Sequence, residues 1–206
     1  MRLPAPRKYR ASDKRRATEQ QNRVAIEAAA WEVFCTIGMD AANIRDIVRR
    51  SGVSAGTFYN YYRTREAIFE VLSERVLERI RNESRVARAR AATAEEFVSA
   101  CYESYLHVLE STPGAMDFID RNQHHIRARL YPSSAVSGLA LDLAEDLQRF
   151  VAPNSLSRQD LALMASILIA AGAEGVFHLG REPRMTLSQL RDFLARFVLH
   201  GLSGWR

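Results

Sequence analysis

Apolar residues recur at helical spacing along the chain, and this periodicity limits the fold more than any other feature of the sequence. Ile26, Ala30 and Val33 follow the i, i+4, i+7 spacing of an amphipathic helix, and similar patterns follow to the last segment. No stretch alternates apolar and polar residues for long enough to predict a strand. We therefore predict an all-α protein.

Capping residues divide this pattern into separate helices. Asn43, with Asp46 three residues later, predicts a capping box, and Ser54 predicts the start of the next helix. Gly38 and Gly52 predict helix ends, because glycine adopts positive φ at little cost. Further helices are expected at about 64–90, 97–109, 115–125, 139–150, 158–179 and 187–202.

Positive charge is concentrated in the first third of the chain. The whole sequence has 29 Lys and Arg against 24 Asp and Glu, and residues 1–65 hold 13 of these bases but only 6 of the acids. The other residues carry a small net negative charge, so a polyanion that contacts only the first third is the simplest interpretation. A basic disordered tail without a specific partner is the alternative.

Residues 43–62, NIRDIVRRSGVSAGTFYNYY, have the pattern of a helix-turn-helix. Two short helices flank a tight turn that contains Gly52. The second helix carries Thr57, Tyr59, Asn60 and Tyr61, whose side chains can form hydrogen bonds with base edges and phosphates. We therefore predict that this segment docks on DNA.

Arg65 lies where a helix should begin, and a cation there opposes the helix dipole. A phosphate at that helix terminus would explain it, because free N–H groups and a basic side chain would bind the anion together. Arg45, at the start of the first short helix, is the other basic candidate for DNA contact.

From about residue 16 to 72 the sequence closely resembles the TetR family of bacterial regulators, on the segments AAAWEVFCTIGMDAANI, RDIVRRSGVSAGTFYNYY and TREAIFEVL. The resemblance implies a flexible basic arm (1–16), a three-helix DNA-binding domain (17–63) and a larger helical effector-binding and dimerisation domain (64–206). It implies DNA contacts by the six residues Arg45, Thr57, Tyr59, Asn60, Tyr61 and Arg65. Two positions depart from the family: Asn43 replaces the usual Thr or Ser cap, and Ala55 replaces a frequent Lys.

The last two expected helices, 158–179 and 187–202, carry more apolar residues than one buried face needs. The family resemblance implies that they form a four-helix interface in a homodimer, which would read a palindromic operator of double-stranded DNA. The alternative is that the two helices bury each other within one subunit.

An effector pocket is expected among the middle helices. Its predicted lining consists of Phe97, Cys101, Tyr102, Tyr105, Phe118, Arg121, Asn122, His125 and Phe177. The stretches PGAMDFIDRNQHHIRAR and SILIAAGAEGVF resemble regulators of unsaturated fatty-acid synthesis that sense acyl chains. A small hydrophobic effector, such as an acyl-CoA or a fatty acid, is therefore expected, with Arg121, Arg127 or Arg129 near its head group.

Neither catalysis nor a metal or cofactor is expected. Residues 52–56 match the G-x-S-x-G nucleophile elbow, but that motif follows a buried strand, whereas an amphipathic helix is expected here. The adjacent His124 and His125 lack further ligands at a recognised spacing. The sequence shows no secretory signal and no apolar run longer than 13 residues, so a cytoplasmic protein that does not span a membrane is expected.

These features predict a ligand-responsive repressor that a small hydrophobic effector releases from its operator. An activator or an effector-independent regulator is one alternative. A helical lipid-binding or interaction protein without a specific operator is another.

Overall fold

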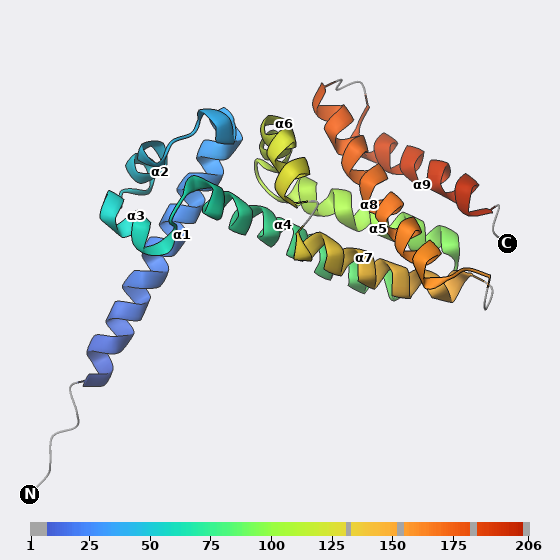
Figure 1. Cartoon of the computed structure of the whole chain (residues 1–206), viewed down its shortest axis with the longest axis horizontal. Coiled ribbons are helices and arrows are strands. Elements are labelled where there is room, and N and C mark those ends of the chain that lie inside the picture. Colours follow the sequence, from blue (N-terminus) through green and yellow to red (C-terminus); the bar gives the residue numbers. More distant parts are fainter. Residues whose placement is uncertain (1–7, 131–132, 152–154, 182–184, 204–206) are drawn as a thin grey trace, which may run out of the picture. The chain divides into compact units, whose positions relative to one another are not determined.

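The computed structural model describes residues 8–130, 133–151, 155–181 and 185–203, and within them it contains helices and no strand (Figure 1). The predicted all-α class is confirmed. The helices are α1 (Lys8–Ala41), α2 (Ile44–Ser51), α3 (Ala55–Tyr61), α4 (Arg65–Arg88), α5 (Ala94–Ser111), α6 (Ala115–His125), α7 (Ser134–Leu147), α8 (Arg158–Arg181) and α9 (Leu187–Ser203). A π-helical turn, Ile126–Leu130, follows α6, and a 3-10 turn, Gln148–Phe150, follows α7.

The chain divides into two compact units, residues 1–72 and 73–206. We predicted a boundary at residues 63 and 64. The observed division lies further along because Ile68, Phe69 and Leu72, in the first two turns of α4, are buried within the first unit. The expected arm covers residues 1–16, but residues 8–16 form the start of α1; residues 1–7 lie outside the described structure.

The core of the first unit forms where α1, α2 and α3 pack together. Phe34, Ile47 and Phe58 are fully buried, and the ring of Phe34 meets that of Phe69 edge to face at 5.4 Å. Aromatic pairs of this geometry stabilise a core beyond their buried area. The short helices α2 and α3, which could not persist alone, are therefore held by α1.

Backbone geometry at the two predicted helix ends agrees with the sequence pattern. Gly38 has φ 75° near the end of α1, and Gly52 has φ 71° directly after α2. The predicted capping box is present: Asn43 Oδ1 accepts from the Asp46 amide, and Asp46 Oδ2 accepts from the Asn43 amide, both at 3.1 Å. Ser54 caps α3 as expected, since its Oγ accepts from the Thr57 amide at 3.1 Å.

In the second unit, α5 packs along α9, and α7 packs along α8. The helix α8 also contacts α6 and α9. Gly172 of α8 makes a close approach possible, because a Cβ there would lie 3.3 Å from the Tyr102 ring and 3.4 Å from the Tyr105 ring. The helix α7 begins earlier than the predicted residue 139, because Ser133 accepts a hydrogen bond from the Val136 amide and caps it.

Two arginine–aspartate pairs join α4 to α7. Arg81 donates from Nε and Nη2 to the two carboxylate oxygens of Asp142, at 2.6 and 2.9 Å. This bidentate contact lowers the pKa of the Asp142 carboxyl and raises the pKa of Arg81. The second pair, Arg88 with Asp146, lies one heptad further along α4.

By length and composition alone, α8 is the one helix in the described part of the chain that could cross a membrane. The 13-residue apolar run seen in the sequence extends into a helix of 24 residues. A core helix of a soluble protein meets the same criterion, and α8 packs against α6, α7 and α9.

Candidate nucleic-acid interface and effector site

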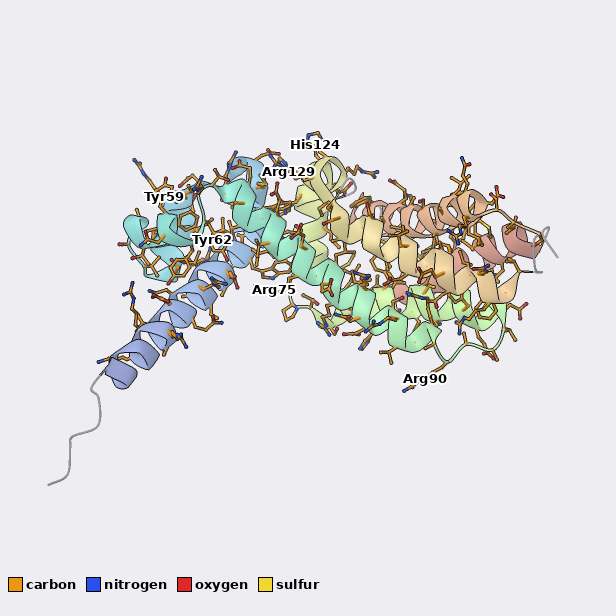
Figure 2. The ribbon with its side chains drawn as sticks, turned by 60° about the horizontal axis from the view of Figure 1, so that its bottom comes forward. Tyr59, Tyr62, Arg75, Arg90, His124 and Arg129 are labelled. Carbon is orange, nitrogen blue, oxygen red and sulfur yellow. The ribbon has the colours of Figure 1, made fainter. Side chains whose placement is uncertain are left out.

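Tyr59 and Asn60 form the exposed polar surface of α3. Tyr59 is 54% exposed, and Figure 2 labels it beside the short helices of the first unit. Its ring leans edge to face on the buried ring of Phe58 at 5.7 Å, which anchors the base of an otherwise exposed side chain. Asn60 is exposed as well, and its amide can both donate and accept. These two side chains are available for contact with a partner.

Arg45 and Thr57 are the next two residues of the predicted interface. Arg45 lies in the first turn of α2 and is exposed. Thr57 is half-buried, and its hydroxyl shares a hydrogen bond of 2.9 Å with the Ser54 hydroxyl. Ser54 therefore serves as the helix cap in a helix-turn-helix, not as a nucleophile after a strand.

Tyr61 is turned toward α1 instead of outward. Its hydroxyl donates to the Glu19 carbonyl at 3.0 Å, and the Arg23 guanidinium lies 6.0 Å from its ring centre. The hydroxyl can still accept a hydrogen bond, so the predicted DNA contact stays a prediction. The observed contact fixes the direction of α1 relative to α3.

Arg65 has a role that the sequence did not indicate. Its Nη1 donates to the carbonyls of Met39 and Asp40 at 2.9 and 3.3 Å and to that of Ala42, and its Nε pairs with Glu66 at 2.9 Å. A cation near the start of α4 is therefore explained by carbonyl groups at the end of α1, and no phosphate is needed to account for it. Its contact with phosphate stays a prediction.

Tyr62 and Glu27 form a buried link between α1 and the residue that ends α3. The Tyr62 hydroxyl donates to Glu27 Oε1 at 2.6 Å, and both side chains are less than a tenth exposed. The burial of Tyr62 makes it a core residue of the first unit, in contrast to the exposed Tyr59. A short hydrogen bond to a carboxylate is among the stronger contacts in a protein interior, so this link holds α3 firmly.

Sequence reasoning missed a basic face of α1, one residue of which lies against Tyr61. Arg16 and Arg23 are exposed and seven residues apart, so they share one face of α1. That is the face on which Arg23 approaches the Tyr61 ring. The i, i+7 spacing of Arg16 and Arg23 could have indicated this face, but the interpretation of residues 1–16 as a flexible arm obscured it.

Among the predicted effector residues, three lie in one row along α5. Phe97, Cys101 and Tyr105 are four residues apart in turn; the first two are buried and the third half-buried. Burial raises the pKa of the Cys101 thiol to about 12, so it remains a neutral thiol at physiological pH. The row is apolar over roughly 12 Å at the helical rise of 1.5 Å per residue.

Tyr102, on the neighbouring face of α5, links that helix to α8. Its hydroxyl donates to the Leu168 carbonyl at 3.3 Å, and burial raises the pKa of its phenol. Phe177, also on α8, is buried under the Arg127 guanidinium, which lies 4.2 Å from the ring centre and pairs with Glu174. Arg127 is thus engaged within the protein at the point where a head group was expected.

The predicted residues on α6 divide between core and surface. Phe118 and Asn122 are buried, and Asn122 Nδ2 donates to the Phe118 carbonyl at 2.7 Å across a kink at φ −120°. Arg121 is exposed, and His125 is half-buried with its ring 5.5 Å from that of His124, which Figure 2 labels.

Comparison with known proteins identifies relatives of the first unit. The family model described as "Bacterial regulatory proteins, tetR family" matches residues 26–72. The HTH-type transcriptional regulator YvdT of Bacillus subtilis is 41% identical over 52 residues, which cover 25% of this chain and 27% of that relative. The matched segment is therefore about a quarter of the relative's length.

Solved structures show the same fold over most of the chain. The fatty acid degradation regulator FadR from Bacillus halodurans superposes with a TM-score of 0.71 at 20% identity, over 88% of this chain and 96% of that one. FadR from Bacillus subtilis in complex with stearoyl-CoA superposes with a TM-score of 0.67 at 16% identity, over 85% and 97%. Both units thus have the fold of these regulators. Over residues 26–72 the chain is similar to the TetR family of bacterial regulatory proteins.

Proposed function

We propose that this protein is a homodimeric transcriptional repressor that binds a palindromic operator and is released by an acyl-CoA. The observation that carries the DNA-binding part is the exposed surface of α3, where Tyr59 and Asn60 project from a rigidly held helix with Arg45 nearby in sequence on α2. The proposed action is binding, not catalysis. The proposed location of the protein is the cytoplasm, where the operator lies.

The chemistry of α3 suits the major groove of DNA. An Asn amide can form a bidentate contact with adenine, and a tyrosine hydroxyl can reach a phosphate or a base edge. The helix carries no acidic side chain that would repel phosphate. Arg45 and the basic face of α1 would supply phosphate contacts, which position the protein without reading sequence.

A row of exposed apolar side chains on α8 and α9 supports the proposed dimer. Leu163 and Ile167 on α8 are 60% and 53% exposed, and Phe193 and Phe197 on α9 are 49% and 63% exposed. The two phenylalanine rings stack at 6.0 Å. The intrasubunit alternative leaves these four side chains in water, whereas a two-fold dimer would bury them.

The effector part rests on the apolar row of α5 and on the likeness to FadR. A row formed by Phe97, Cys101 and Tyr105 suits an alkyl chain, since it offers no charged group along its length. The FadR structure with stearoyl-CoA shows that this fold accommodates an acyl-CoA in another protein.

The decisive experiment is a gel-shift titration of the purified full chain with the DNA fragment upstream of its own gene. We expect a shift that weakens with salt and is absent with a scrambled fragment of equal length. Added stearoyl-CoA should reverse the shift, whereas coenzyme A alone should not.

Each alternative has its own outcome in this titration. A specific shift that stearoyl-CoA leaves intact would indicate an effector-independent regulator or a different ligand class. A shift whose effect on a reporter gene is stimulation would indicate an activator. Equal affinity for operator and scrambled DNA would contradict the proposal and favour a lipid-binding or interaction protein.

A further inference from the structure

Arg88, at the end of α4, is a fully buried arginine in the second unit. Its side chain has 0% exposure, and it is the largest fully buried side chain among the described residues. Transfer of a guanidinium from water to a protein interior is costly unless every donor finds an acceptor. The partners of each nitrogen therefore show whether the site is complete.

Two of the three guanidinium nitrogens have partners. Nε donates to Asp146 Oδ2 at 2.9 Å, and Nη1 donates to the Ser84 hydroxyl at 2.6 Å. Nη2, which carries two N–H groups, is buried without a hydrogen-bond partner among the described residues. Buried donors in native proteins are almost always satisfied, so this nitrogen calls for an acceptor.

The surroundings of Arg88 connect it to the predicted effector row. Arg88 and Asp146 are both close enough to Cys101 to affect its pKa electrostatically. One turn before Cys101, Phe97 packs its ring 5.2 Å from that of Phe150. Beside Phe150, Arg149 donates to the Arg88 carbonyl at 3.0 Å. Arg88 therefore lies near the Phe97–Cys101 part of the apolar row on α5.

Charge decides which kind of acceptor fits. The positive charge of Arg88 is already paired with the Asp146 carboxylate. A carboxylate at Nη2 would place a second negative charge beside Asp146, and burying it costs more desolvation free energy than burying a neutral oxygen. A neutral carbonyl oxygen satisfies Nη2 and leaves the ion pair neutral. The Asp146 side chain is 29% exposed, so one edge of the pair is open to solvent.

We propose that Arg88 Nη2 is the hydrogen-bond donor that holds a carbonyl oxygen of the effector, the thioester carbonyl where the effector is an acyl-CoA. The alkyl chain would then extend along Phe97, Cys101 and Tyr105. This inference rests on the effector part of the proposed function. It adds Arg88 Nη2 as the atom that recognises the carbonyl end of the acyl chain.

The test compares stearoyl-CoA with S-octadecyl-CoA, a thioether that lacks only the carbonyl oxygen. Both are titrated into the full chain by calorimetry. Wild-type protein should bind the thioester roughly tenfold or more tightly than the thioether, the usual effect of one hydrogen bond from a charged donor. Arg88→Lys keeps a cation for Asp146 but loses Nη2. It should abolish this preference, so that both ligands bind with about equal affinity.

Two further variants separate recognition from folding. Arg81→Lys alters the other α4–α7 pair, whose nitrogens Nε and Nη2 both have partners, and should keep the wild-type preference. The double variant R88M/D146L replaces the buried ion pair with apolar side chains, a change that proteins often tolerate, and should bind both ligands equally. In wild type, the infrared carbonyl stretch of bound, ¹³C-labelled stearoyl-CoA should lie at lower frequency than in R88K.

The outcomes distinguish this inference from the proposed function. Equal binding of both ligands by wild type, or a preference that survives in R88K, would overturn the inference and point to a buried water as the acceptor. If wild type binds neither ligand, the acyl-CoA effector fails and the inference fails with it. DNA binding is measured independently by gel shift, and its result bears only on the DNA-binding part of the proposed function.

Discussion

At the scale of single residues, the hydrogen bond between Tyr62 and Glu27 links α1 to the end of α3. The bond is 2.6 Å long and buried, and it joins side chains 35 residues apart in sequence. Removal of the hydroxyl would leave a buried carboxylate oxygen without this donor. A contact of this kind therefore affects stability more than recognition.

We expect Tyr62→Phe to lower the free energy of unfolding by about 1–3 kcal/mol, the usual effect of a lost hydrogen bond to a buried charged group. Urea unfolding followed by circular dichroism measures it. Tyr59→Phe is the matched control, because the Tyr59 side chain is 54% exposed, and it should leave stability unchanged. Equal loss in the two variants would contradict this role.

Asn60 belongs to the same scale, but its expected effect is on specificity. Asn60→Ala should lower the preference for operator over scrambled DNA by roughly tenfold to a hundredfold, since one good base contact is worth about 1–3 kcal/mol. Arg45→Ala should instead weaken binding to both DNAs by similar factors, as loss of a phosphate contact does. Competition gel shifts measure both ratios, and unchanged preference in N60A would exclude the assignment.

At the scale of elements, the amino-terminal half of α1 presents a basic face that we expect to contact phosphates. Arg16→Ala and Arg23→Ala should each lower the slope of log affinity against log salt by about 0.9, the value for one phosphate contact. Arg15→Ala, on another face and paired with Glu19 at 3.1 Å, is the control. A slope that falls equally in all three variants would show only the effect of net charge.

The α4–α7 pair gives stability a defined dependence on pH. Arg81 holds the pKa of Asp142 below its ordinary value, so the contribution to stability is present above about pH 4 and is lost as the pH falls through the folded-state pKa. Asp142→Asn should therefore lower the melting temperature at pH 7, and the difference from wild type should narrow toward pH 3. Asp192→Asn, which breaks an exposed pair, should have little effect at either pH.

Sequence patterns predicted the elements well because their signals are local. Capping by Asn43 and Ser54 depends on residues three positions away, and both caps are present. The acceptors of Arg65 lie 23 to 26 residues earlier, and those of Arg88 include Asp146, 58 residues later. No periodicity marks such partners. Arg65 therefore suggested a phosphate site, and Arg88 was not singled out at all.

At the scale of the whole molecule, the exposed apolar side chains of α8 and α9 should determine the oligomeric state. Ile167→Asp and Phe197→Asp each place a charge in the proposed interface, and we expect either to yield monomers with much weaker operator binding. Sedimentation equilibrium measures the mass. Leu141→Asp is the control, since Leu141 is 64% exposed on α7, outside the proposed interface, and it should remain dimeric.

The two arginine–aspartate pairs between α4 and α7 also limit how these helices can move. Arg81 and Arg88 lie seven residues apart, and Asp142 and Asp146 lie four apart, so a slide of α4 along α7 would disturb at least one of the two contacts. The next register that again aligns side chains is about one helical turn away, roughly 5.4 Å. A shift of α4 along α7 should therefore occur as a step between two discrete positions, not as a continuous movement.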